Sequence, residues 1–458
     1  MARAEEMVAD GAKLGGPFQV RAAAAWKVVL PNCFAEEIRN NPNLDFKETQ
    51  HIEFPTTLPG WEGMNEGLRH DRLFTDLVRI KLTQSLNYIT EDMVDEADYA
   101  LNLWMSEDES SWKTYNVRQV GFDVVARITS RVFAGKGLSR NEAYLRIAKE
   151  NTATSFIAGY TLLQFPRFLW PFLNRVMPYC RTVRRQLNDA THLLRPSIEA
   201  TIKQYEDGDI KKGPKSGNAL GWLIEIQKGR PLELVSFVGA QLSLSMASIE
   251  NTFKMLACCL IQCISHPEVI DPLRKEMVEI LKENGWSKSS MQKMKLLDSF
   301  LKEVQRVDNF LAIMNRYVNK DTFLSDGTCI PAGAMLVVLD SGARDPDIYA
   351  EPEKFIADRY LRMREKPGSA NRHYLVSTSS DNLGFGLGQH ECPGRFFVAH
   401  ELKMLMVFLL LRYDWRFKPG YQPPSTHLFE HNRVFPRNME LQARRRKEEI
   451  DLLDLRYS

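Results

Sequence analysis

The chain has 458 residues, a formal net charge of +2 and a hydrophobic content of 44%. A chain of this length and apolar content can bury a large core. Its length is compatible with roughly two to four domains, or with one large α-rich enzyme. The near-neutral charge gives no argument for nucleic-acid binding, because the one basic run, at residues 444–447, is short. Nucleic acid is therefore not among the expected partners.

Seven cysteines are present, an odd number, and none forms a Cys-x-x-Cys pair. This pattern indicates neither a disulfide framework nor a zinc site. Cys258, Cys259 and Cys263 lie in a long apolar stretch and are typical of the core of a reduced, cytosol-facing protein. The uncharged apolar run at 404–411 is too short for a membrane span, which needs ~20 residues.

The first 60 residues predict two short strands, at 18–20 and 26–30. Apolar residues at three- and four-residue spacing then predict helices over 71–105, 116–133 and 140–205. A polar loop containing Gly and Pro follows at 207–217.

The longest helical candidate covers residues 231–266, with proline in its first turn and Pro267 after its end. It is apolar on much of its circumference but carries Glu250, Asn251 and Lys254. These polar residues predict a helix buried in protein rather than one facing lipid.

Further helices are expected at 268–282 and 290–307. Asp326-Gly327 between apolar runs predicts a hairpin, and residues 334–339 predict the next strand. No internal repeat is evident. The chain is therefore predicted to be mainly α with a small β portion.

The most informative stretch, at 385–394, reads Phe-Gly-Leu-Gly-Gln-His-Glu-Cys-Pro-Gly. It places Cys392 after a glycine-punctuated loop and before a largely apolar helix. The glycines let the backbone curl under the sulfur, backbone N–H groups can point at it, and the start of the helix favours thiolate over thiol. The pattern predicts that Cys392 is the thiolate ligand of a heme iron.

The string Phe385-x-x-Gly-x-His-x-Cys392-x-Gly resembles the heme-binding signature of cytochrome P450 enzymes. Residues 382–397 resemble the fungal members that serve secondary-metabolite pathways. The resemblance covers essentially the whole chain and implies the cytochrome P450 fold, one catalytic domain over 1–458, and heme b as cofactor. Fungal relatives begin with a membrane-spanning helix, so we expect that an anchor has been removed from this chain; a naturally soluble form is the alternative.

A second match is a Glu-x-x-Arg pair, Glu303 and Arg306, three residues apart on one helix face. Such a pair taken alone is typical of a solvated surface. Residues 297–306 resemble the Glu-x-x-Arg helix of the family, and 352–360 resemble the segment whose arginine, here Arg359, completes the network. The resemblance implies a buried structural network of these three residues that holds the heme-binding loop.

Other cofactor contacts are implied by position. Phe385 opens the signature, and His390 and Arg316 match positions that bind heme propionates in the family. The alternatives are a solvent-facing loop residue for His390 and a surface strand charge for Arg316. Arg79 and Lys81 are weaker candidates for the same task.

The long helix carries the residues expected to act in oxygen chemistry. The family pattern places an acid and then a threonine where this chain has Glu250 and Asn251. An amide can hold water but passes a proton less readily than a hydroxyl. Thr252 lies about 100° further around the helix, whereas Ser248 shares the face of Asn251 and could contribute a hydroxyl. Asn251 is either a tolerated substitution in a normal monooxygenase or a sign of a different reaction.

Substrate-facing positions are weakly encoded and mostly apolar, which suits a lipophilic substrate. Each position is also compatible with plain core packing. The candidates are Ser243, Met246, Phe310, Ile313, Met314 and Phe435.

The resemblance implies a heme-thiolate monooxygenase that hydroxylates C–H bonds of a terpenoid, steroid-like or alkaloid intermediate. Its implied partners are NADPH–cytochrome P450 reductase and, optionally, cytochrome b5. We expect a monomer at the cytosolic face of the endoplasmic reticulum membrane, with a soluble cytosolic form as the alternative. Two other functions remain open: an atypical rearranging, coupling or cyclising enzyme of the same fold, and a non-catalytic heme-binding or sensor protein.

Overall fold

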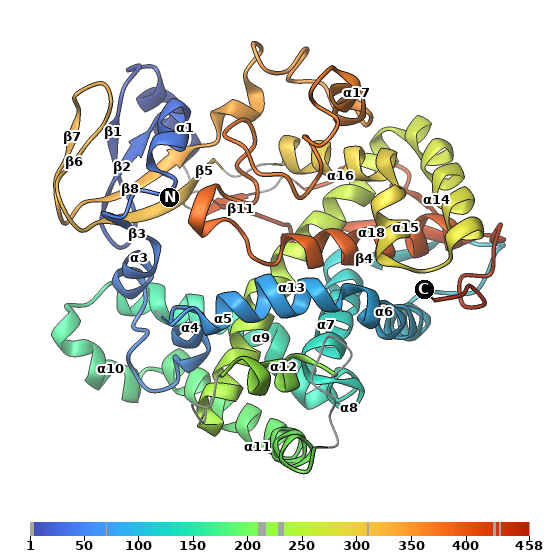
Figure 1. Ribbon diagram of the computed structural model, residues 1–458, viewed down its shortest axis with the longest axis horizontal. Helices are drawn as coiled ribbons and strands as arrows, with labels where there is room; N and C mark the ends of the chain where they lie inside the picture. The colour runs from blue at the N-terminus through green and yellow to red at the C-terminus, as the bar shows by residue number, and fades with distance from the viewer. Residues whose placement is uncertain are drawn as a thin grey trace. The chain divides into compact units, whose positions relative to one another are not determined.

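The computed structural model describes residues 4–69, 71–208, 217–227, 233–308, 311–424, 427–429 and 432–457. The chain divides into two compact units, each assembled from separated stretches of sequence (Figure 1). The first unit comprises Met1–Pro55, Ser299–Arg395 and Ser425–Pro436. The second comprises Thr56–Asp298, Phe396–Pro424 and Arg437–Ser458. The single catalytic domain over 1–458 stays a prediction.

The first unit is built on a five-stranded sheet with the order β1-β2-β8-β5-β3. Only the β2–β8 pair is parallel; the other neighbours are antiparallel. All five residues of the central strand β8 are buried, as expected where both faces of a sheet are covered. The strands are β1 (Phe18–Arg21), β2 (Trp26–Leu30), β3 (Leu44–Asp45), β5 (Ala312–Val318) and β8 (Met335–Leu339).

Strand β5 alternates buried and half-buried residues along its whole length. Its pairing with β8 shifts register between Ile313 and Arg316, and Met314 within that stretch has φ of 59°. A non-glycine residue in the left-handed region costs on the order of 1–3 kcal/mol and persists only where its surroundings impose it. Here Met314 is held by the apolar cluster around Leu336 and Leu383.

Short helices and hairpins complete the first unit. Asp45 caps α3 by accepting the N–H groups of Lys47 and Glu48. The predicted hairpin around Gly327 is present, with φ of 86° at that glycine. The elements are α1 (Ala4–Ala12), η1 (Asn32–Phe34), α2 (Ala35–Ile38), α3 (Phe46–Glu53), most of α16 (Lys295–Val307), β6 (Thr322–Phe323), β7 (Cys329–Ile330), η5 (Ser341–Arg344), α17 (Arg359–Glu365), η6 (Gly388–His390), β10 (His427–Phe429) and β11 (Asn432–Val434).

The second unit is largely helical (Figure 1). Its helices before the long central one are α4 (Glu62–Gly67), α5 (Leu73–Asp76), η2 (Leu77–Leu82), α6 (Thr83–Trp104), α7 (Val117–Ala134), α8 (Lys136–Ser139), α9 (Glu142–Leu162), η3 (Arg167–Leu169), α10 (Trp170–Val176), α11 (Pro178–Glu206) and α12 (Ala219–Ile226). Those from it onward are α13 (Leu234–Ser265), η4 (Pro267–Val269), α14 (Ile270–Asn284), α15 (Lys288–Lys293) and α18 (Arg395–Arg412), which enters the unit at Phe396. A small antiparallel sheet has the order β4-β12-β9, formed by β4 (Lys113–Asn116), β12 (Glu440–Arg445) and β9 (Tyr413–Arg416).

Helix α13 has 32 residues and packs against α4, α7 and α11. It is the one helix of the described residues that is long and apolar enough to cross a bilayer, but 61% of its most apolar window is buried inside the protein. That burial agrees with the sequence-based prediction of a core helix.

The predicted mainly α fold with a small β portion is confirmed. The helices predicted over residues 140–205 are present as α9, a short 3-10 turn, α10 and α11, whose boundaries the apolar pattern did not give. Pro166 precedes the 3-10 turn, and Pro171 and Pro178 lie in the first turns of α10 and α11. Proline lacks an N–H group, so it favours a helix start over a helix interior. Most of the predicted loop at 207–217 lies outside the described residues.

Candidate functional site

The Cys392 loop belongs to the first unit and contains two glycines with left-handed backbone conformations. Gly386 and Gly388 have φ of 70° and 76°, which side chains rarely adopt. The loop closes on itself because the N–H of Cys392 donates to the carbonyl of Phe385 at 2.7 Å. Phe385 and Cys392 are both half-buried.

Close packing of the loop explains why glycine is required. A Cβ on Gly388 would lie 2.6 Å from the carbonyl oxygen of Arg39, and a Cβ on Gly384 would lie 2.5 Å from the side chain of Gln305. Asn40 also accepts the N–H of Gln389 at 2.8 Å. The loop is therefore held against two other segments of its own unit.

Arg395 fixes the end of the loop after the cysteine. Its guanidinium donates to the carbonyls of Cys392 and Val376 and pairs with Glu391 at 2.7 Å. Glu391 in turn accepts the hydroxyl of Thr378 at 2.8 Å. These contacts leave the cysteine backbone little freedom to move.

Burial raises the pKa of the Cys392 thiol, while backbone hydrogen bonds from Gly394 and Arg395 and the charge of Arg395 oppose that rise. Amide donors aimed at the sulfur are the arrangement that stabilises a metal-bound thiolate. No group of three or more His, Cys, Asp and Glu side chains suited to a metal ion occurs among the described residues. A single cysteine ligand fits heme iron, because the macrocycle itself would supply most of the other donors to the iron.

The structure brings Glu303, Arg306 and Arg359 together in the first unit. Arg306 donates to both carboxylate oxygens of Glu303 at 2.8 Å, and Arg359 Nε lies 3.0 and 3.1 Å from the same oxygens. Glu303 also accepts the N–H of Ile356 at 3.0 Å. All three ionic side chains are buried, so the carboxylate is fully compensated by charge and hydrogen bonds.

Other guanidinium N–H groups of the network donate hydrogen bonds to backbone carbonyls. Arg306 donates to the carbonyls of Ala343 and Pro352 at 2.8 and 2.7 Å, and both arginines donate to Lys354. The ring of Tyr349 lies 5.2 Å from the Arg306 guanidinium carbon. The network thus fastens the segment around 343–359 to α16.

Arg316 is the second cationic feature of the first unit. It is 3% exposed, and its guanidinium donates to the carbonyl of Asn315 at 2.9 Å. Burial lowers the pKa of the Arg316 guanidinium to about 10, which the nearby Asp45 carboxylate partly offsets. No carboxylate forms an ion pair with Arg316 among the described residues. A buried guanidinium of this kind fits an anionic ligand such as a heme propionate.

His390 ends the short turn η6, two residues before Cys392. Its ring is half-buried and lies 5.9 Å from the ring of Phe46, tilted by 45°. The structure therefore places His390 partly packed against Phe46 and partly exposed. Its contact with a propionate stays a prediction.

Helix α13 of the second unit is mostly buried, but a few residues near its middle are exposed or half-buried. Ala247 and Asn251, four residues apart, are exposed, and Met246 and Glu250 are half-buried. Thr252 is completely buried, as expected from its position about 100° around the helix. Asn251 rather than Thr252 therefore lies on the open face of α13.

Glu250 forms a bidentate ion pair with Arg118 of α7, at 2.7 and 2.8 Å. The Arg118 guanidinium carbon lies 4.6 Å from the ring centroid of Phe122 and 5.5 Å from that of Phe253. Sequence reasoning identified Glu250 but missed Arg118, because its position on α7 gives no local signal of a contact 132 residues away.

Ser248 is buried, and its hydroxyl donates to the carbonyl of Leu244 at 2.6 Å. This back-bond to its own helix occupies its proton. Lys81 pairs with Glu225 of α12, whereas Arg79 is exposed on the π-helical turn η2.

The predicted substrate-facing residues separate into two groups. Ser243 and Met314 are buried within their own units: a Cβ on Gly67 would lie 2.4 Å from Ser243 Oγ, and Met314 belongs to an apolar cluster. Phe435 is 2% exposed. Met246 and Ile313 remain half-buried. Phe310 lies outside the described residues.

Comparison with known proteins agrees with these observations. A family model described as cytochrome P450 matches residues 68–438. The chain is 37% identical to cytochrome P450 monooxygenase bsc11 of Alternaria brassicicola, over 98% of this chain and 87% of that protein. It is 36% identical to cytochrome P450 monooxygenase TRI1 of Fusarium sporotrichioides, over 89% and 74%, and 35% identical to adrA of Penicillium rubens, over 89% and 80%. The expected resemblance to fungal members is confirmed, and the chain belongs to the cytochrome P450 family of monooxygenases.

Proposed function

We propose that this protein is a heme-thiolate monooxygenase that uses dioxygen and reductase-delivered electrons to hydroxylate a C–H bond of a lipophilic secondary metabolite. The observation that carries the proposal is the Cys392 loop, with its two left-handed glycines and its amide donors near the sulfur. The monooxygenase names of the relatives favour this reaction over rearrangement, coupling or a non-catalytic role.

The cofactor proposed is heme b, whose iron the Cys392 thiolate would bind and whose propionates Arg316 and His390 would contact. When bound, the heme supplies the iron that binds and activates dioxygen. The Cys392 loop keeps the sulfur in place through the Phe385 and Arg395 hydrogen bonds. The Glu303 network braces the same unit.

On α13, the residues available for moving protons are Glu250 and Asn251. The Asn251 amide would hold a water molecule by hydrogen bonds, and the Glu250 carboxylate, held by Arg118, would be the nearby group that accepts and returns a proton. Ser248 contributes less than its position suggested, because its hydroxyl already donates to Leu244.

The substrate class is inferred from the apolar character of Met246 and Ile313, the predicted substrate-facing residues that are half-buried. We propose terpenoid, steroid-like or alkaloid intermediates. The proposed electron donor is NADPH–cytochrome P450 reductase, with cytochrome b5 as an optional second donor, and the protein is proposed to act as a monomer.

The proposed location is the cytosolic face of the endoplasmic reticulum membrane. An apolar stripe supports it: Phe168, Phe172 and Val176, spaced by four residues, are 79%, 64% and 47% exposed. Exposed Arg167 and Arg175 flank the stripe and suit anionic lipid headgroups. Flotation with phosphatidylserine-containing vesicles tests this, since Phe168→Ser with Phe172→Ser should reduce binding and an exposed Phe323→Ser control should not.

The test of the function has two steps. A carbon monoxide difference spectrum should report a thiolate-ligated heme in the parent, and Cys392→His should lose that signature while keeping its fold by circular dichroism. Reconstitution with reductase, NADPH and ¹⁸O₂ should then give a product with one labelled oxygen. A thiolate spectrum without any product from a broad lipophilic panel would favour the non-catalytic reading, and a product without label would favour rearrangement.

A further inference from the structure

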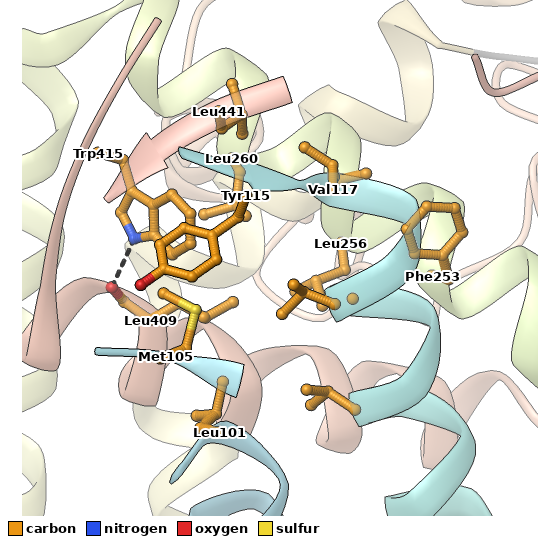
Figure 2. A pocket seen from close by; sticks show the side chains of 14 residues that line it. Leu101, Met105, Tyr115, Val117, Phe253, Leu256, Leu260, Leu409, Trp415 and Leu441 are labelled. Carbon is orange, nitrogen blue, oxygen red and sulfur yellow. Dashed lines mark hydrogen bonds between the residues drawn. The ribbon is translucent and has the colours of Figure 1, made fainter. Parts of the chain in front are cut away.

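A small cavity lies inside the second unit, between α7 and the C-terminal half of α13. Figure 2 shows Trp415, Tyr115 and Met105 gathered on one side of it and Val117 of α7 on the other. Leu256 and Leu260 of α13 contribute further apolar walls. The cavity volume is about 30 Å³.

The lining is almost entirely apolar and offers water few hydrogen-bond partners. Trp415 Nε1 already donates to the carbonyl of Leu409 at 2.8 Å, and the Tyr115 hydroxyl already accepts the N–H of Ser106 at 2.9 Å. None of the described lining residues has a buried side-chain N or O atom without a partner. A buried water molecule needs roughly two to four polar partners, so the cavity favours an apolar occupant.

The size of the cavity limits that occupant. A volume of about 30 Å³ is two to three times the roughly 10–15 Å³ that one water molecule requires. This suits a single heavy gas atom or a diatomic molecule. Pockets for lipophilic organic substrates are larger, at about 300–1,000 Å³.

The cavity adjoins the part of α13 that carries the proposed proton-moving residues. Its first α13 wall residue, Phe253, is two residues after Asn251, and the Phe253 ring lies under the Arg118 guanidinium that holds Glu250. The Phe253 ring is therefore shared between the cavity wall and the surroundings of this ion pair.

We propose that this cavity is a binding site for a small apolar gas, with dioxygen as its natural occupant. The choice of dioxygen rests on the proposed function, because a monooxygenase consumes it. The site would raise the local concentration of dioxygen beside α13, since an apolar cavity without water takes up apolar molecules.

Gly121 offers a way to reduce the cavity. A Cβ there would lie 3.2 Å from two ring atoms of Phe253, so Gly121→Ala adds a methyl group to the wall. Val124→Ile adds one methylene to another lining residue and is a second route should the first variant fold poorly. Gly137→Ala is the matched control, because a Cβ on that helical glycine meets nothing within 4 Å.

The first measurement uses xenon as the probe and does not depend on turnover. Xenon-pressurised crystals or ¹²⁹Xe NMR of the heme-loaded enzyme should show one site among the lining residues in the parent and in Gly137→Ala. Occupancy should fall in Gly121→Ala and Val124→Ile. Absence of xenon from the parent cavity overturns the proposal, whatever the enzyme does.

The second measurement is the apparent KM for dioxygen at saturating substrate. Gly121→Ala and Val124→Ile each fill the space of about one buried CH₂ group, so the apparent KM for dioxygen should rise about fourfold while kcat stays unchanged. The Gly137→Ala control should keep the KM and kcat of the parent. Xenon binding with an unchanged KM for dioxygen overturns the assignment of dioxygen. A chain that binds xenon here but consumes no dioxygen contradicts the proposed function and leaves the gas site standing.

Discussion

Two glutamates with completely buried side chains, Glu303 in the first unit and Glu401 in the second, have opposite surroundings. Glu303 receives two guanidinium groups and one backbone N–H. Among the described residues, Glu401 of α18 accepts only the Thr129 hydroxyl at 3.2 Å, and its other carboxyl oxygen has no partner there.

Burial disfavours a charge, and partners decide whether the charge survives. The arginines compensate the Glu303 carboxylate. Burial raises the pKa of Glu401 to about 8, against an opposing contribution from Thr129. Equal burial therefore gives an ionic network in one unit and a neutral carboxylic acid at pH 7 in the other.

Breaking the network should have the largest effect. Glu303→Gln leaves Arg306 and Arg359 buried without a counter-charge, which costs roughly 3–5 kcal/mol in the free energy of unfolding. We expect strongly reduced yield of heme-containing protein, and urea unfolding by far-UV circular dichroism measures the loss in what remains. Arg359→Lys keeps the charge but loses the guanidinium fork, so it should cost less.

The control for this prediction is Glu353→Gln, on an exposed residue of the same segment. It should change the free energy of unfolding by less than about 0.5 kcal/mol. Equal stability of the Glu303 and Glu353 variants would show that the network does not hold the unit together.

Glu401→Gln should act in the opposite direction and depend on pH. Because the folded-state pKa of Glu401 is raised from 4.5 to about 8, its contribution to stability is fully present below about pH 4.5 and is lost as pH rises through 8. Glutamine mimics the neutral acid. The variant should match the parent at pH 5 and exceed it at pH 8, by on the order of 1–3 kcal/mol.

Urea unfolding at several pH values between 5 and 8.5 measures this difference. Glu279→Gln, on an exposed face of α14, is the control and should give a flat difference from the parent. A Glu401→Gln variant that is less stable at pH 8 than at pH 5, relative to the parent, would mean that the folded protein holds Glu401 as a carboxylate.

The sequence predicted Glu303, Arg306, Arg359 and Cys392 because each belongs to a short motif with fixed spacing. It also predicted α13, whose apolar pattern is long. It gave no indication of Glu401 or of Arg118, since their surroundings come from contacts distant in sequence.

The break between α9 and α11 shows the same limit in the fold. Helical periodicity continues across Pro166, Pro171 and Pro178, so the pattern predicted helices over 140–205 without their boundaries. The prolines mark the helix starts, but they are also found inside helices, as Pro196 in α11 shows. Local pattern gave the element type, and tertiary contacts decided its ends.

Arg316 sharpens the comparison, because it is a buried charge that forms no ion pair with a carboxylate among the described residues. If a heme propionate fills that role, Arg316→Gln should speed heme transfer from the enzyme to apomyoglobin by about tenfold or more, from the roughly 1.5–3 kcal/mol of a hydrogen bond to a charged group. Arg316→Lys should be intermediate. The exposed Arg362→Gln control should transfer heme at the parent rate. Unchanged transfer in Arg316→Gln would assign the guanidinium a purely structural role.

Glu250 should have the smallest effect on stability of the residues compared. Its ion pair with Arg118 is partly exposed and therefore screened by water, so it contributes about 1 kcal/mol or less to the free energy of unfolding. Its neighbour Asn251 should therefore affect chemistry rather than folding. We expect Asn251→Ala to lower the product formed per NADPH consumed severalfold, because it removes a group that orders water, and Asn251→Thr to equal or exceed the parent. Thermal unfolding should move little in either variant. Equal coupling in all three proteins would mean that substrate or bulk water, rather than this side chain, supplies the proton.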